Sequence, residues 1–151
     1  MKPWNDVEIP AVDSAINFPL LSLTNSASGK KEEVKRKPVY RMYVCGITPY
    51  DATHLGHAST YLTFDLINRY LTASGSEVRY VQNITDIDDP LLERANRDGV
   101  DWTELAHQQI DLFRSDMINL RVIPPAHYIG AVDAIPLVTD AIAELFSKGS
   151  I

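Results

Sequence analysis

Three short polar segments between residues 43 and 89 hold the side chains most able to do chemistry. The only cysteine, Cys45, ends a strand-like run, and His54 and His57 follow it in a His-x-Gly-His sequence. A second strand-like run then leads into the sequence Asn-Ile-Thr-Asp-Ile-Asp-Asp at 83–89. The order of strand, His-x-Gly-His, helix and strand is the one that a nucleotide-activating α/β domain needs, so we predict nucleotide chemistry here.

His54 and His57 predict an anion site at the start of a helix. Apolar periodicity predicts that helix over about 56–74, so both imidazoles would lie beside its unpaired backbone N–H groups and positive dipole end. Gly56 has no Cβ and would let a nucleotide approach closely. Two imidazole donors would stabilise charge on an α-phosphate during adenylyl transfer. The alternatives are a chance motif and a metal pair, and no third ligand follows at zincin spacing.

Cys45 has an ordinary structural interpretation when it is considered alone. A single cysteine at the end of a buried strand usually serves as a small apolar side chain. No Cys-x-x-Cys sequence completes a zinc site inside this chain. Only its sequence context favours a functional role.

The acidic residues of the third segment suggest either a magnesium site or helix caps. We favour caps, with Asp89 as the N-cap of a helix that begins at Pro90 and with Asp86 and Asp88 near its positive end. Asn83 and Thr85 are better candidates for ligand contact. The ligand crevice of an open α/β sheet lies outside the carboxyl ends of its strands.

Composition indicates a protein of one globular domain. The 151 residues are 45% hydrophobic and 23% charged, and no apolar stretch approaches the ~20 residues of a membrane span. The N-terminus lacks the apolar core of a signal peptide, and one cysteine cannot form an internal disulfide, so we expect a cytoplasmic protein that does not contact membranes. The net charge of −6 argues against nonspecific binding to nucleic acid. We interpret the basic run at 30–37 as a solvated turn, with an RNA-contacting patch as the minority alternative.

Local patterns divide the chain into an N-terminal arm, 1–38, and an α/β domain, 39–151. The arm should form a β-hairpin around a turn at 25–29. Strands are predicted over 39–45 and 77–82, and helices over 56–74, 90–98, 101–121 and 135–148. Gly75, Gly99 and the Pro124-Pro125 pair are the expected stops. The last helix carries an apolar stripe at four positions, namely Ile135, Val138, Ile142 and Leu145.

The three polar segments together resemble the cysteine-activating class I aminoacyl-tRNA synthetases and their relatives. The matching sequences are Tyr-Val-Cys-Gly-Ile-Thr-Pro-Tyr-Asp at 43–51, His-Leu-Gly-His at 54–57 and Asn-Ile-Thr-Asp-Ile-Asp-Asp at 83–89. The resemblance implies a Rossmann-like, nucleotide-binding α/β catalytic domain. It also implies that the lysine-bearing KMSKS loop and the remaining zinc ligands lie beyond position 151, so we expect only the N-terminal half of that domain.

Two kinds of enzyme in this branch differ in the acceptor of the activated cysteine. One loads tRNA, as cysteinyl-tRNA synthetase. The other joins cysteine to the amine of glucosaminyl-inositol (GlcN-Ins) in mycothiol biosynthesis. Pro49, Pro90 and the arm with Trp4 resemble the second kind, which we favour. The alternatives are a tRNA synthetase and an inactive fragment of either enzyme.

The resemblance implies a role for each matching position. His54 and His57 would be catalytic, and Cys45 would be a ligand of Zn²⁺. The adenylate and ATP would contact eight further residues besides Cys45, namely Gly46, Ile47, Thr48, Gly56, Thr60, Asn83, Ile84 and Thr85. The implied partners are the substrates L-cysteine, ATP with Mg²⁺, and GlcN-Ins, with tRNA only under the alternative, and a monomer is expected.

Overall fold

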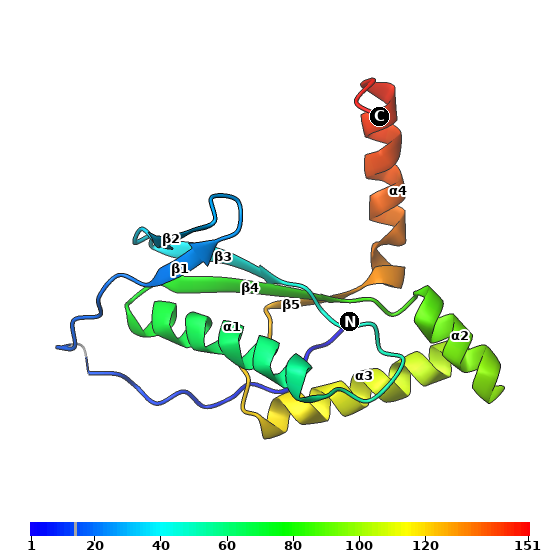
Figure 1. The fold of residues 1–151 in the computed structure, drawn as a ribbon, viewed down its shortest axis with the longest axis horizontal. Helices are drawn as coiled ribbons and strands as arrows, with labels where there is room; N and C mark the ends of the chain where they lie inside the picture. Colours follow the sequence, from blue (N-terminus) through cyan, green and yellow to red (C-terminus); the bar gives the residue numbers. More distant parts are fainter. Residues whose placement is uncertain (14) are drawn as a thin grey trace.

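A three-stranded parallel sheet with helices on one face forms the centre of the fold. The computed structural model describes residues 1–13 and 15–151. Strands β3 (Val39–Val44), β4 (Glu77–Ile84) and β5 (His127–Gly130) lie side by side in that order, and both pairings are parallel. Figure 1 shows α1 (Leu55–Ala73) and α3 (Trp102–Asn119) together on one side of the sheet. The predicted α/β class is therefore confirmed.

The buried face of the sheet follows the alternation of its strands. In β4, Tyr80, Gln82 and Ile84 face the helices and are buried, whereas the intervening residues are more exposed. Ile110, Phe113 and Met117 of α3 pack against them at helical spacing. The opposite face of the sheet is not covered by the residues that the structure describes, since Tyr43 and Ile129 are 62% and 41% exposed. Parallel sheets are normally covered on both faces.

The N-terminal arm contributes to this core. Trp4 is only 5% exposed, its Nε1 donates to the Val122 carbonyl at 2.8 Å, and its ring packs edge-on against Phe113 and Tyr128. Further along the arm, β1 (Ser22–Asn25) and β2 (Lys30–Glu33) pair antiparallel, which confirms the predicted hairpin. The basic residues of this hairpin, Lys30 and Lys31, are exposed.

The acidic residues after β4 act as helix caps. The N-cap of α2 (Asp89–Asp98) is Asp88, which accepts from the Asp89 N–H at 2.9 Å, so the prediction of Asp89 as the cap was wrong by one residue. Pro90 stands in the first turn and Gly99 ends the helix at a φ of 68°, as predicted. Asp86 accepts from the Val132 N–H at 3.0 Å and so caps the start of α4 (Ala131–Ser147).

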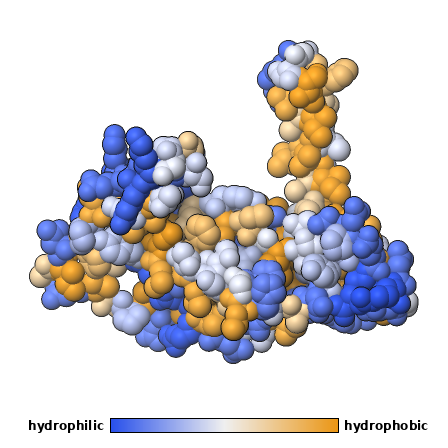
Figure 2. Space-filling model, viewed as in Figure 1, coloured by the Kyte–Doolittle hydropathy of each residue, from blue (hydrophilic) through white to orange (hydrophobic). Residues whose placement is uncertain are grey.

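Helix α4 projects from the rest of the molecule (Figure 1). It begins at Ala131, earlier than predicted, and none of its residues is buried. The predicted apolar stripe is present, but Ile135, Val138 and Ile142 are each about half exposed, and Figure 2 shows apolar side chains along the projecting helix. Among the residues that the structure describes, no helix is both long and apolar enough to span a membrane.

Candidate active site

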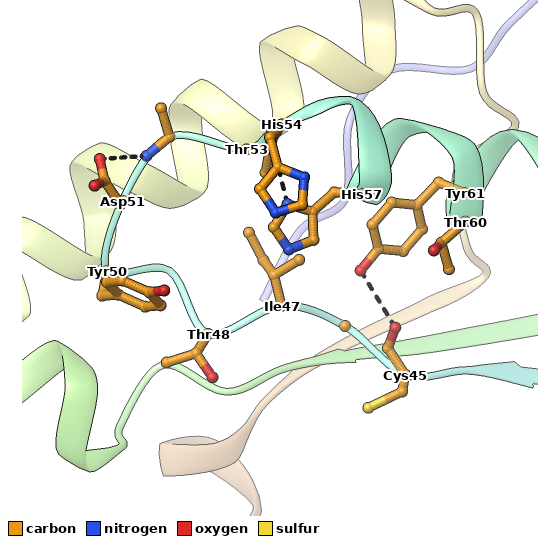
Figure 3. A pocket seen from close by; sticks show the side chains of 12 residues that line it. Cys45, Ile47, Thr48, Tyr50, Asp51, Thr53, His54, His57, Thr60 and Tyr61 are labelled. Atoms are coloured by element: carbon orange, nitrogen blue, oxygen red, sulfur yellow. Dashed lines mark hydrogen bonds between the residues drawn. The ribbon is translucent and has the colours of Figure 1, made fainter.

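A hollow of about 540 Å³ lies where β3 ends and α1 begins (Figure 3). This position is the carboxyl edge of the parallel sheet, where open α/β folds bind their ligands. The hollow is bounded by the loop between β3 and α1 and by the first turns of α1. Its lining residues are Cys45, Gly46, Ile47, Thr48, Tyr50, Asp51, Ala52, Thr53, His54, His57, Thr60 and Tyr61.

The chain packs closely against the end of β4 just after β3, where the lining of the hollow begins. The Gly46 N–H and the Tyr43 hydroxyl both donate to Asn83 Oδ1, at 2.8 and 2.9 Å. A Cβ at position 46 would lie 1.8 Å from the Asn83 carbonyl oxygen, so only glycine fits there. One step further, the Thr85 N–H donates to the Ile47 carbonyl at 3.0 Å. Asn83 and Thr85 therefore hold the first residues of the β3–α1 loop, Gly46 and Ile47, in place.

Helix α2 braces the middle of the loop through Arg94. Its guanidinium donates to the Tyr50 carbonyl at 2.9 Å and pairs with Asp51 at 3.1 Å and Asp98 at 2.7 Å. Hydrogen bonds from the Ala52 N–H and then from Arg94 lower the pKa of Asp51 below its ordinary value. Tyr50 and Asp51, which line the hollow, are thus held in place by α2, a helix that does not line it.

Two further side-chain hydrogen bonds fix the ends of the loop. The Thr53 hydroxyl donates to Asp116 of α3 at 2.7 Å. The Thr48 hydroxyl donates to Asp88 at 3.1 Å, so the carboxylate that caps α2 also holds the loop. These bonds leave the loop anchored at both ends before any ligand binds.

His54 and His57 cap α1 reciprocally. His54 is the N-cap residue, and its Nδ1 accepts from the Gly56 N–H at 3.0 Å. The His57 Nδ1 accepts in turn from the His54 N–H at 3.2 Å. The two rings stack with their centroids 4.1 Å apart. Partial burial, and then the charge of His54, lower the pKa of His57 below its ordinary 6.5, so His57 is neutral at pH 7.

The cap changes how this helix start would bind an anion. We expected unpaired backbone N–H groups there, but the Gly56 N–H is taken by His54, and the His57 and Ala58 N–H groups donate to the His54 carbonyl. The predicted backbone anion site is therefore largely occupied by the protein's own cap. Among the described residues, the second nitrogen of each imidazole, Nε2, has no hydrogen-bond partner, so it is available to a ligand.

Cys45 and Thr60 complete the lining with Tyr61. The Tyr61 hydroxyl donates to the Cys45 carbonyl at 3.2 Å, and burial raises the pKa of Tyr61 well above its ordinary value, so it remains a donor. The Thr60 hydroxyl donates to the Gly56 carbonyl at 3.2 Å. The Cys45 side chain is exposed.

Cys45 does not form a zinc site with the other described residues. Zinc usually takes four ligands in proteins, of which at least three come from side chains. In residues 1–13 and 15–151, no group of three or more His, Cys, Asp or Glu side chains is placed to hold a metal ion. Cys45 can thus supply one ligand, and the set would need donors from outside these residues.

The structure brings together seven of the residues that the sequence indicated. They are Cys45, Gly46, Ile47, Thr48, His54, His57 and Thr60. Gly56 lies beside the hollow within the cap, and the other three predicted contacts, Asn83, Ile84 and Thr85, are outside the lining. Ile84 is fully buried in the core.

Sequence reasoning missed Tyr50, Asp51, Ala52, Thr53 and Tyr61. The first four belong to the β3–α1 loop. A loop at this edge of a sheet lines the crevice along its length, so its position in the sequence was a signal that the whole loop would contribute to the lining. Tyr61 follows His57 by four positions and so shares its helix face.

The fold and the hollow define an α/β domain with a parallel sheet and a histidine pair at the helix that follows its first sheet strand. The family described as "tRNA synthetases class I (C) catalytic domain" matches residues 31–151, so the chain belongs to this family.

Similar curated proteins carry a more particular name. The sequence is 57% identical over 150 residues to "L-cysteine:1D-myo-inositol 2-amino-2-deoxy-alpha-D-glucopyranoside ligase" of Nakamurella multipartita, covering 99% of this chain and 36% of that protein. Proteins of the same name from Parafrankia sp. and Kribbella flavida are 56% and 55% identical over 86% and 100% of this chain. The chain spans 29% and 37% of their lengths, or about a third of the relatives that it matches.

Proposed function

We propose that this chain serves an ATP-dependent ligase that activates L-cysteine as cysteinyl-adenylate and transfers it to the amine of GlcN-Ins. The observation that carries the proposal is the 53–57% identity to relatives named as ligases of these two substrates, across nearly the whole chain in most of them. The hollow at the carboxyl edge of the sheet supports it, since this is the place where such a domain would bind ATP.

The reaction would proceed in two group transfers. A carboxylate oxygen of cysteine attacks the α-phosphorus of ATP, and pyrophosphate leaves. The sugar amine then attacks the carbonyl carbon of the adenylate, an amide forms, and AMP leaves. Both steps develop negative charge on phosphate oxygens, where fixed N–H donors are most effective. Nε2 of His54 and Nε2 of His57 are the donors that this chain would supply.

Other residues of the hollow would position the nucleotide rather than react. Gly46 lets the start of the loop pack against the Asn83 backbone, and the braced loop of Tyr50 and Asp51 keeps its shape. Preorganisation of this kind lowers the cost of binding, because few groups must be ordered when the ligand arrives. Mg²⁺ would accompany the triphosphate as part of the substrate.

Zinc belongs to the proposal as a property of the longer protein. The Cys45 thiolate would supply one ligand, and donors outside the present sequence would supply the rest. A thiolate-binding metal would select cysteine over serine, because zinc prefers a soft sulfur ligand to a hydroxyl. A reduced thiol at position 45 fits a cytoplasmic location.

A second candidate function is cysteinyl-tRNA synthetase. It is favoured by the family description itself, which names tRNA synthetases. Activation of cysteine would be the same, and only the acceptor would differ. Pro49 and Pro90, which resemble the sugar-amine ligases, favour the first candidate.

Cysteine-dependent exchange between ATP and pyrophosphate tests the activation step that both candidates share. With the full-length protein, we expect exchange with cysteine and little with serine. The Cys45→Ser variant should lose zinc and the preference for cysteine, whereas Cys45 would not matter in an enzyme that activates another substrate. Unchanged zinc content and unchanged cysteine activation in this variant would contradict the proposal.

A further inference from the structure

The two histidines of the cap use the same ring nitrogen. His54 Nδ1 accepts from the Gly56 N–H, and His57 Nδ1 accepts from the His54 N–H. A nitrogen that accepts a hydrogen bond carries no proton, and a neutral imidazole then has its proton on the other nitrogen. The backbone geometry thus assigns both tautomers.

We propose that the reciprocal cap of α1 locks both imidazoles in the Nε2–H tautomer and so presents two fixed N–H donors to the hollow. The same two side chains would then both cap the helix and bind an anionic group such as a phosphate. The tautomers follow from the cap alone, whereas their use on a substrate phosphate rests on the proposed function.

The cap also explains why these side chains are the donors available at this place. The Gly56, His57 and Ala58 N–H groups already have partners within the cap. An aspartate N-cap would satisfy the helix equally well but has no side-chain N–H, and the amide nitrogen of an asparagine N-cap would lie closer to the backbone than Nε2 does. Imidazole is the neutral side chain that accepts at one end and donates at the other with a rigid ring between them.

A proton on Nδ1 would break the capping hydrogen bond and, with it, the fixed orientation of the Nε2–H donor. An imidazolium has a proton on both nitrogens, so Nδ1–H would face a backbone N–H, donor against donor. The stacked rings, 4.1 Å apart, also disfavour a charge on both. The neutral form of His57 is therefore the one that fits this cap.

No neighbouring anion offsets this effect among the described residues. Asp51 lines the hollow with both histidines and pairs with Arg94, and Asp116 lines a second hollow with His54 and accepts from Thr53. No carboxylate of the described chain hydrogen-bonds either ring. The remaining titratable groups of the lining are Cys45, Tyr50 and Tyr61. Tyr61 stays protonated because burial raises its pKa.

Nitrogen NMR of the ¹⁵N-histidine-labelled chain tests the tautomers directly. His107 and His127 are the internal controls, since both are exposed and neither makes a side-chain hydrogen bond among the described contacts. At pH 7.5 we expect Nδ1 of His54 and His57 in the unprotonated range and Nε2 in the N–H range, with averaged shifts for the two controls. A proton on Nδ1 of either capping histidine, or averaging like that of the controls, would overturn the proposal.

Two substitutions separate the cap from the donor. His54→Asn keeps an acceptor at the N-cap and should hold the unfolding equilibrium constant within about twofold of the parent, whereas His54→Ala should raise it about fivefold. Both should bind ATP at least tenfold more weakly in the full-length protein, because neither asparagine nor alanine has a donor at the position of Nε2. Equal stability loss in the two variants, or ATP affinity retained by His54→Asn, would count against the proposal. If the tautomers hold but ATP leaves the imidazole signals unmoved, the proposed function fails and the locked cap stands.

Discussion

At the residue scale, His57 links the stability of the chain to pH. Its folded pKa lies below the ordinary 6.5 of an unfolded histidine, because burial and the neighbouring His54 disfavour the charge. The unfolded state therefore binds more protons as the pH falls below 6.5. The stability contributed by neutral His57 is complete above pH 6.5 and is lost as the pH falls toward the folded pKa.

Urea unfolding at pH 7.5 and pH 5.5 would detect this contribution. We expect the unfolding free energy of the parent to fall more between the two pH values than that of His57→Gln, which cannot titrate. His107→Gln, at an exposed position of α3, serves as the control and should behave like the parent. Equal pH dependence in the parent and His57→Gln would refute the linkage.

Gly46 gives a second prediction at this scale. A methyl group there would lie 1.8 Å from the Asn83 carbonyl, which belongs to a central strand and cannot move aside. Gly46→Ala should therefore destabilise the chain by about 3 kcal/mol or more, as overpacking of rigid atoms does. Gly130→Ala is the matched comparison. Its methyl would meet the Asp86 side chain at 2.6 Å, which can rotate, so thermal unfolding should show a smaller loss.

Sequence patterns predicted which candidate residues would lie together but not the hydrogen bonds among them. The His-x-Gly-His spacing at a helix start was enough to predict that His54 and His57 would lie together at the sheet edge. That each ring caps the helix through Nδ1 depends on ring orientation, which spacing does not encode. Asn83 shows the same limit, because its place after a strand was predicted, whereas its amide oxygen is used by Gly46 and Tyr43.

At the element scale, long periodic segments were predictable and short ones were not. The nineteen residues of α1 and the alternation of β4 carry strong period signals. Strand β5 has only four residues and follows two prolines, so no period could identify it. Its pairing with β4 supplies the hydrogen bonds that make it a strand. The early start of α4 likewise depends on a cap from Asp86, 46 positions earlier in the chain.

The cap of α4 can be tested by hydrogen exchange. In Asp86→Ala, the Val132 N–H loses its acceptor, so we expect its exchange protection to fall about tenfold, equivalent to roughly 1.4 kcal/mol, with smaller effects later in the helix. Asp133→Ala removes a negative charge from the same turn without removing that acceptor. A similar loss of protection in both variants would mean that charge, and not the cap, holds the helix start.

At the scale of the whole molecule, the arm and the α/β domain share one core. Trp4 is buried among Phe113 and Tyr128 and bonds to the Val122 carbonyl. Trp4→Ala should cost about 3–5 kcal/mol of unfolding free energy, measured by urea denaturation. Ile16→Ala, at a 54% exposed position of the same arm, should cost less than about 0.5 kcal/mol. Equal effects would show that the arm does not belong to the core.

The open face of the sheet and the apolar stripe of α4 also belong to this scale. The stripe at Ile135, Val138 and Ile142 correctly predicted a helix, because periodicity reports local structure. It did not report burial, since burial requires a facing surface and the described residues supply none. The chain spans about a third of the length of its curated relatives.

The choice of acceptor tests the central claim most directly. The full-length protein would be given ATP and cysteine together with equal amounts of GlcN-Ins and tRNA, and the products would be identified by mass spectrometry. We predict an amide of cysteine and GlcN-Ins, formed with one AMP and one pyrophosphate per product and lost in His57→Ala by ~100-fold in rate. Cysteine esterified to tRNA, with no amide of the amino sugar, would contradict the account.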